Sequence, residues 1–265
     1  MNKKVVLVSR PAGDVKATDF QLTTEPINTS LKAGEVLVKV EWISIDPAQR
    51  GKYYLVWISG VRSYIPPIGI NQVIRSMGTG NVVASKSPIF KRGDYVSGFL
   101  GWQEFAIVNS TDIEKLPSYE NPQLSLGVFG LPGLTAYFSL IEVAKAKAGE
   151  TIVISTAAGS VGSIACQIGK LLGCHVIGIC GSDSKGAYLT NELKVDGWVN
   201  YRSESHLQSA LRKLCPKGID VYIDHVGGKV LDAVLANIRK NARIVLSGAI
   251  SSYNQKQAPP IYNYS

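Results

Sequence analysis

The sequence predicts an α/β protein with two domains, a partly open β-barrel followed by a doubly wound parallel sheet. Its 265 residues are enough for one to two domains of ordinary size. Over residues 1–125, short strand-like runs are separated by glycine and proline, which is typical of a small barrel. Over residues 126–265, strand-like and helix-like runs alternate, which predicts βαβ units and a parallel sheet. We therefore place the domain boundary after residue 125.

The strands of the first half are expected from alternating hydrophobicity and from glycines at bends. In the clearest case, Val36, Val38 and Val40 share one face of a half-buried strand that ends near Trp42. The expected strands are 5–8, 36–42, 78–84 and 95–99, with a turn at 91–94.

The second half begins with a strand at 151–155, a glycine-rich turn and a helix. The helix is expected over 160–172, because apolar residues recur at helical spacing on one face and Gly173 then ends it. Further strands are expected at 176–180, 198–199, 221–223 and 244–247, and further helices at 187–193 and 207–214.

Charge and cysteine content limit the possible partners. The chain carries 28 Lys and Arg against 20 Asp and Glu, a net charge of +8, but the basic residues are scattered and form no nucleic-acid motif. We interpret them as a solvated surface, and the binding of a small anionic ligand is the alternative. The four cysteines have no CxxC spacing, and no cysteine or histidine precedes Cys166, so we expect neither disulfides nor a metal site.

The sequence also gives an expectation for location. No apolar run approaches the length of about 18 residues that a membrane span needs. The amino-terminal apolar run is too short for a signal peptide, so we expect a cytosolic protein with no membrane partner.

The strongest motif is Ala157-Ala158-Gly159-Ser160-Val161-Gly162, between the expected strand at 151–155 and its helix. Small residues at these positions allow a tight turn, a close approach of backbone to a pyrophosphate, and close packing of helix and strand. The helix amino terminus adds N–H groups that favour an anion. Since alanine stands at the first glycine position, a glycine-rich turn without a ligand is the alternative.

The end of the next strand favours NADP over NAD. An NAD site usually has an acid there to bind the ribose hydroxyls. Here the strand ends in Cys180-Gly181-Ser182, and Lys185 brings a cation toward a 2′-phosphate, to which Tyr201 adds a hydroxyl. Asp183 is the exception, because it is an acid that an NAD site could use. Lys185 alone would be read as a surface lysine.

Several blocks between Glu35 and Tyr253 resemble one known family. They are 46–51, 130–137, 157–163, 181–185, 200–201, 224–228 and 247–254. The chain resembles the zinc-free branch of the medium-chain dehydrogenase/reductases, in particular the NADP-dependent alkenal reductases of the leukotriene hydroxydehydrogenase/prostaglandin reductase type. The resemblance implies a GroES-like substrate domain, a Rossmann domain, NADP(H) as cofactor, and a homodimer for the full-length form.

The resemblance also implies roles for individual residues. The glycine loop would hold the pyrophosphate, and Lys185 with Tyr201 the 2′-phosphate. His225 stands where the family usually has asparagine; it would bind a cofactor ribose with an affinity that changes near pH 6.5, or else be an ordinary strand-end histidine. The implied cofactor contacts are Pro47, Thr135, Gly159, Ser160, Val161, Gly162, Lys185, Tyr201, His225, Ser247, Gly248, Ala249, Ile250, Ser251, Ser252 and Tyr253.

The activity that the resemblance implies is reduction of the carbon–carbon double bond of α,β-unsaturated aldehydes or ketones, without a metal. The cofactor supplies hydride, so the protein needs to position the double bond and stabilise the enolate oxygen. Tyr253 is the candidate catalytic residue, although a loop tyrosine without a role is the alternative. Tyr53, Tyr64 and Trp102 are candidates for the substrate wall, although a place in the core is the favoured interpretation for each one taken singly.

Two other functions remain compatible with these residues. A quinone oxidoreductase would use the same scaffold and an apolar cleft. A non-catalytic NADPH-binding protein would keep the glycine loop and Lys185 without a productive substrate site.

The residues after the expected fifth parallel strand are too few for another crossover helix and strand. A complete dinucleotide fold of this kind has six strands, and a crossover takes about a dozen residues or more. We therefore expect the Rossmann sheet to be truncated at its carboxyl end, with the fifth strand as an exposed edge.

Overall fold

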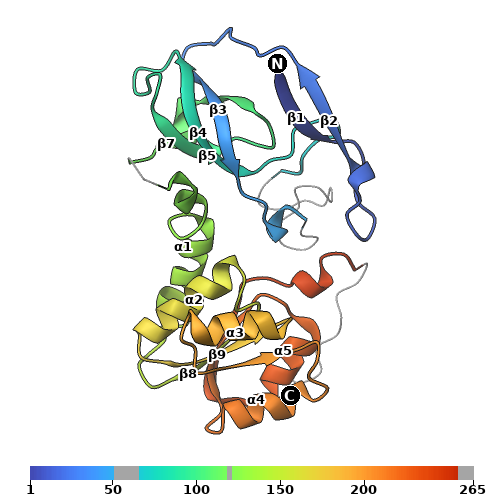
Figure 1. The fold of residues 1–265 in the computed structure, drawn as a ribbon, viewed down its shortest axis with the longest axis vertical. Coiled ribbons are helices and arrows are strands. Elements are labelled where there is room, and N and C mark those ends of the chain that lie inside the picture. Colours follow the sequence, from blue (N-terminus) through green and yellow to red (C-terminus); the bar gives the residue numbers. More distant parts are fainter. Residues whose placement is uncertain (51–65, 118–120, 256–265) are drawn as a thin grey trace. The chain divides into compact units, whose positions relative to one another are not determined.

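The computed structural model describes residues 1–50, 66–117 and 121–255 (Figure 1). Two compact units, residues 1–126 and 127–265, are each described by themselves. Among the described residues, no helix combines the length and hydrophobicity that a membrane span needs.

The first unit contains a curled antiparallel sheet in the order β6-β3-β4-β5-β7. Valines of its strands, including Val36, Val38, Val82 and Val96, fill the core, as their alternation predicts. The strands are β3 (Glu35–Ile43), β4 (Met77–Ser85), β5 (Tyr95–Phe99), β6 (Phe105–Asn109) and β7 (Ile113–Lys115). The short helical turns are η1 (Ala17–Asp19), η2 (Pro47–Gln49), η3 (Ser110–Asp112) and η4 (Pro122–Leu126).

A hairpin of β1 (Asn2–Leu7) and β2 (Phe20–Glu25) adds a second small sheet to this unit. Leu7 is buried with Ile68 and Ile74, and the rings of Phe20 and Trp102 pack on them. These two rings are stacked, with centroids 6.0 Å apart. The hairpin therefore has its own apolar cluster.

The second unit is the predicted doubly wound parallel sheet, in the order β10-β9-β8-β11-β12 within the described residues. Its strands are β8 (Thr151–Ile154), β9 (His175–Cys180), β10 (Gly197–Asn200), β11 (Ile219–Asp224) and β12 (Ile238–Leu246). Its helices are α1 (Leu131–Tyr137), η5 (Phe138–Val143), α2 (Ser160–Leu171), α3 (Asp183–Asn191), α4 (Leu207–Leu214), α5 (Gly228–Leu235) and η6 (Ile250–Ser252).

Successive residues of the central strands face opposite helical layers. Ile152 and Ile154 belong to the apolar cluster that includes residues of α2 and α3, whereas Val153 and Tyr222 belong to the cluster of α4 and α5. Figure 1 shows these two pairs of helices on opposite sides of the strands. Because both faces are covered, the strands are almost wholly apolar.

Two predicted elements begin four or more residues earlier than expected. Helix α3 begins at Asp183 rather than at residue 187, because the Ser182 hydroxyl accepts a hydrogen bond from Lys185 N and caps it. Strand β12 begins at Ile238 rather than at residue 244, and its first four residues are exposed. Among the described residues, β12 pairs only with β11 and so lies at the edge of the sheet. Its polar first residues therefore show no alternating apolar pattern from which a strand could be predicted.

Candidate active site

The carboxyl ends of the five parallel strands meet at one edge of the second unit, which is where ligands bind in such sheets. Most predicted site residues follow these ends. The glycine loop follows β8, Lys185 follows β9, Tyr201 follows β10, His225 follows β11, and 247–253 follow β12. The fold therefore brings together residues that are up to about 95 positions apart, as expected for a parallel sheet.

The loop after β8 is held in a tight turn. Thr156 has a φ of +47°, which is strained for a β-branched residue, and its carbonyl accepts a hydrogen bond of 2.8 Å from Gly159 N. A Cβ at Gly162 would lie only 2.2 Å from that same carbonyl oxygen. Only glycine fits at position 162, so α2 can begin close to β8 with its first N–H groups at the edge of the sheet.

The carboxylate of Asp183, at the start of α3, is hydrogen-bonded to the neighbouring strand β10. Asp183 Oδ1 accepts a hydrogen bond of 2.8 Å from Asn200 Nδ2 at the end of β10. Asn200 Oδ1 in turn accepts from Arg202 N at 3.1 Å. The carboxylate of Asp183 is therefore engaged by a neighbouring strand, which weakens its case as the acid of an NAD site.

Cations and hydroxyls gather where β9 ends. Tyr201 is 41% exposed, and its hydroxyl lies 3.3 Å from Arg202 Nε. A Cβ at Gly181 would be 3.2 Å from the Tyr201 ring, so the absence of a side chain at Gly181 leaves space for this ring. Lys185 is exposed and, among the described residues, forms no ion pair. Sequence reasoning missed Arg202, although it directly follows the predicted Tyr201.

Asp224, which the sequence did not single out, organises the end of β11. It is 1% exposed, and its Oδ1 accepts hydrogen bonds from Tyr222 Oη at 2.8 Å and from Val226 N and Gly227 N at 2.9 Å each. Its backbone carbonyl accepts from Ser247 N and Gly248 N. Burial beside this carboxylate raises the pKa of Tyr222 well above its ordinary value. An aspartate between a strand and Gly227-Gly228 was the available signal.

The structure corrects the expectation that His225 titrates near pH 6.5. Burial lowers the pKa of His225 to about 4, so the ring is neutral throughout the physiological range. Its backbone N–H donates to Ser155 Oγ at 2.8 Å. Its Nε2 is buried without a hydrogen-bond partner among the described residues. A buried polar atom of this kind ordinarily has a partner, and a ligand supplies one.

The segment after β12 is bound to the end of β11. Ser251 Oγ donates to Val226 O at 2.6 Å, and Ile250 N donates to His225 O at 3.1 Å. The Tyr253 hydroxyl accepts from Ala249 N at 3.3 Å. Tyr253 therefore folds back over its own loop, and its hydroxyl proton has no acceptor within the part of the chain that the structure describes.

The remaining predicted residues have different surroundings. Thr135 lies in α1, where its hydroxyl donates to Leu131 O at 2.7 Å. Pro47 begins η2 in the first unit. Trp102 packs in the apolar cluster of the β1–β2 hairpin, and its Nε1 is buried without a partner among the described residues. Tyr53 and Tyr64 lie outside the described residues.

Other reactive groups are placed away from solvent. All four cysteines are buried and free, and burial raises the pKa of Cys166 to about 12 and that of Cys215 to about 11. In the part of the chain that the structure describes, no group of three or more His, Cys, Asp and Glu is arranged to hold a metal ion.

A cavity of about 570 Å³ lies beside β10 and α4, and none of the predicted cofactor residues lines it.

Comparison with family models gives two matches. Residues 3–116 match the N-terminal domain of oxidoreductases, and residues 160–263 match a model described as zinc-binding dehydrogenase. The second match coincides with most of the βαβ unit.

Known proteins are similar over almost the whole chain. The NADPH-dependent curcumin reductase of Escherichia coli is 40% identical over 260 residues, which cover 98% of this chain and 73% of that protein. The NADP(+)-dependent 2-alkenal reductase of Nicotiana tabacum is 36% identical, with 99% of this chain and 76% of that protein covered. CurA from Vibrio vulnificus in complex with NADPH has a TM-score of 0.90 at 38% identity, with 97% of this chain and 75% of that chain covered.

Proposed function

Because the chain belongs to the medium-chain dehydrogenase/reductase family, among its NADP-dependent oxidoreductases, we propose that it uses NADPH to reduce a carbon–carbon double bond conjugated to a carbonyl group. The substrate class that we propose is α,β-unsaturated aldehydes and ketones. The observation that carries the choice of NADPH is the end of β9. There the Asp183 carboxylate is bonded to Asn200, and the Arg202 guanidinium, which forms no ion pair among the described residues, lies beside Gly181.

The residues at the sheet edge fit NADPH. The space at Gly162 lets the loop after β8 approach a pyrophosphate closely, and the α2 amino terminus provides N–H groups for it. Lys185 and Tyr201 would hold the 2′-phosphate. His225 Nε2, which has no partner among the described residues, would bond a ribose hydroxyl, and the segment 247–253 would line the nicotinamide and its ribose.

In this proposal, the bound cofactor supplies hydride to the β-carbon of the conjugated double bond. The protein's part is to orient that bond and to stabilise the negative charge that develops on the carbonyl oxygen. The Tyr253 hydroxyl is the proposed donor, because its one hydrogen bond among the described residues uses the oxygen as acceptor and leaves the proton for a substrate oxygen. A proton from solvent then reaches the α-carbon.

The pKa of His225 bears on this role. A histidine that is neutral from about pH 5 upward keeps one ring nitrogen as donor and the other as acceptor. We therefore propose that His225 holds the cofactor ribose with an affinity that does not change across the physiological pH range.

We propose aromatic residues of the first unit as substrate contacts. Trp102, Tyr53 and Tyr64 are aromatic residues of the first unit, and such side chains suit an apolar substrate. The packing of Trp102 against Phe20 supports a role in the core at least as well.

The test is NADPH oxidation by the purified protein with a panel of medium-chain enals, enones and small quinones. We expect saturable rates with enals and enones that exceed the rates with quinones. Turnover of quinones alone would favour a quinone oxidoreductase. Absence of turnover with every substrate, in protein that binds NADPH, would favour a non-catalytic NADPH-binding protein.

A further inference from the structure

Arg202 stands next to the proposed phosphate site but is not among the residues that the sequence assigned to it. Its backbone is fixed, because its N–H donates to Asn200 Oδ1 at 3.1 Å directly after β10. The preceding Tyr201 N donates to Cys180 O at 3.0 Å, which joins this turn to the end of β9. The two residues are therefore carried together to the carboxyl edge of the sheet.

The guanidinium group is held over the end of β9. Its Cζ lies 5.8 Å from the centroid of the Tyr201 ring, and its Nε lies 3.3 Å from the Tyr201 hydroxyl. A Cβ placed on Gly181 would be 3.4 Å from the same Nε. The arginine thus lies beside the glycine that leaves room at this strand end, rather than extending into solvent away from it.

The charge of Arg202 has no counter-ion in the part of the chain that the structure describes. None of the described ion pairs includes Arg202, and the nearby Asp183 is bonded to Asn200 instead. Lys185, in the first turn of α3, likewise forms no ion pair among the described residues. Two cations and the hydroxyls of Ser182 and Tyr201 therefore lie around one strand end, where the nearby carboxylate of Asp183 is bonded to Asn200.

We propose that Arg202 is a specificity-determining residue that binds the 2′-phosphate of NADPH together with Lys185. The inference rests on the proposed use of NADPH and adds a second cation to that site. A guanidinium group can donate two parallel N–H bonds to phosphate oxygens, which a lysine cannot do. Its contact with the Tyr201 ring and hydroxyl orients it for this purpose.

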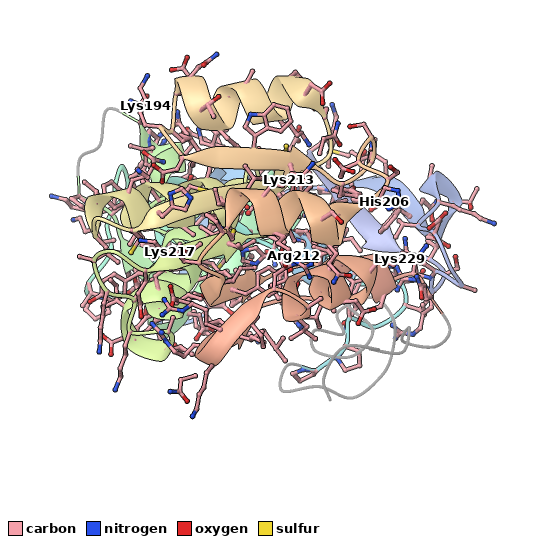
Figure 2. All side chains as sticks on the ribbon, turned by 90° about the horizontal axis from the view of Figure 1, so that it is seen from below. Lys194, His206, Arg212, Lys213, Lys217 and Lys229 are labelled. Carbon is pink, nitrogen blue, oxygen red and sulfur yellow. The ribbon has the colours of Figure 1, made fainter. Side chains whose placement is uncertain are left out.

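The test uses two probes that differ only in the phosphate, adenosine 2′,5′-bisphosphate and adenosine 5′-monophosphate. Their dissociation constants are measured by calorimetry with wild type, Arg202→Ala, Arg202→Lys and a control, Arg212→Ala. Arg212 is an equally exposed arginine in the last turn of α4 (Figure 2). No reaction is needed for this readout.

We expect Arg202→Ala to bind the bisphosphate about 10- to 100-fold more weakly and the monophosphate unchanged, as for a lost bond to a charged group. Arg202→Lys should lose less, and Arg212→Ala nothing. Equal losses for both probes would overturn the proposal and indicate stacking on the adenine instead. An Arg202→Ala variant that binds the bisphosphate like wild type would also overturn it.

Failure of the Arg202 assignment can be distinguished from failure of the proposed activity. If wild type binds the bisphosphate and Arg202→Ala loses it, while no enal is reduced, the proposed function fails and the assignment of Arg202 stands. If enals are reduced with NADPH and Arg202→Ala keeps full affinity for the bisphosphate, the assignment of Arg202 fails and the proposed function stands.

Discussion

The ends of β9 and β11 lie at the same edge of one sheet but have opposite physical character. Around the end of β9, Lys185, Tyr201 and Arg202 are exposed, and the cations have no carboxylate partners among the described residues. At the end of β11, Asp224 is buried and its carboxylate accepts three hydrogen bonds, and His225 is neutral with its Nε2 buried.

This difference suggests different roles for the two strand ends: the exposed charges can bind a ligand, whereas the buried carboxylate stabilises the fold. Exposed charges contribute little to folding because water solvates them, so they are available for an anion. A buried carboxylate with three donors is costly to remove, because the donors lose their partners without gaining water. We therefore expect substitutions after β9 to change cofactor choice and substitutions at the end of β11 to change stability.

The largest effect is expected for Asp224→Ala. Loss of the acceptor removes one hydrogen bond from the buried Tyr222 Oη and the shared partner of the Val226 and Gly227 N–H groups, so the free energy of unfolding should fall by about 3 kcal/mol or more. Urea denaturation measures this change. Asp183→Ala, which removes the exposed carboxylate of the other region, is the matched control and should cost about 1 kcal/mol. A similar small loss for Asp224→Ala would remove the contrast between the two regions.

The next effect concerns pH and His225. Because the folded pKa of about 4 lies below the unfolded value of about 6.5, the unfolded chain binds a proton that the folded chain does not, and stability falls as pH drops through this range. At about pH 5 the penalty should be roughly 2 kcal/mol relative to pH 7.5. His225→Asn should remove it, as seen from unfolding free energies at both pH values. An unchanged pH dependence in the variant would mean that His225 is not buried as a neutral group.

At the other strand end, Lys185→Ala should act on the cofactor alone. The KM for NADPH should rise about 10- to 100-fold, with the KM for NADH nearly unchanged, because only NADPH carries the 2′-phosphate. Lys217→Ala, an exposed lysine after α4, is the control (Figure 2). Equal effects on the two cofactors would show that Lys185 does not read the phosphate.

The smallest effect is expected for Tyr253→Phe. Its hydroxyl is proposed to donate to an oxygen whose charge grows in the transition state, so kcat with enones should fall about 2- to 10-fold, more than the KM for NADPH rises. Tyr188→Phe, which removes the hydroxyl of an exposed tyrosine of α3, should change neither. Unchanged kcat across several enones would assign Tyr253 to the packing of its loop.

The sequence predicts the regular elements well where burial imposes a pattern. Helix α4 occupies the residues expected, and α2 differs by one residue at its end. The sequence predicts α3 only from residue 187, so Gly186 lies outside the expected helix. In the structure a Cβ there would lie 2.3 Å from the Trp198 ring, so the glycine serves helix–strand packing.

The site was predictable where chemistry has a local signature and not where it depends on tertiary neighbours. The glycine loop and Lys185 follow from spacing. The bond between Asp183 and Asn200, the position of Arg202 beside Gly181 and the burial of His225 arise from strands that meet only in the folded sheet. The same residue type, an aspartate after a strand, is exposed at 183 and buried at 224, which no local pattern distinguishes.

The most direct test of the proposed reaction is the position of deuterium in the product. A 2-alkenal is incubated with the protein and NADPH that carries deuterium at the transferable C4 position of the nicotinamide, and the product is analysed by NMR. We predict a saturated aldehyde with deuterium at the β-carbon. An allylic alcohol with deuterium at the former carbonyl carbon, or a product without deuterium, would contradict reduction of the carbon–carbon double bond.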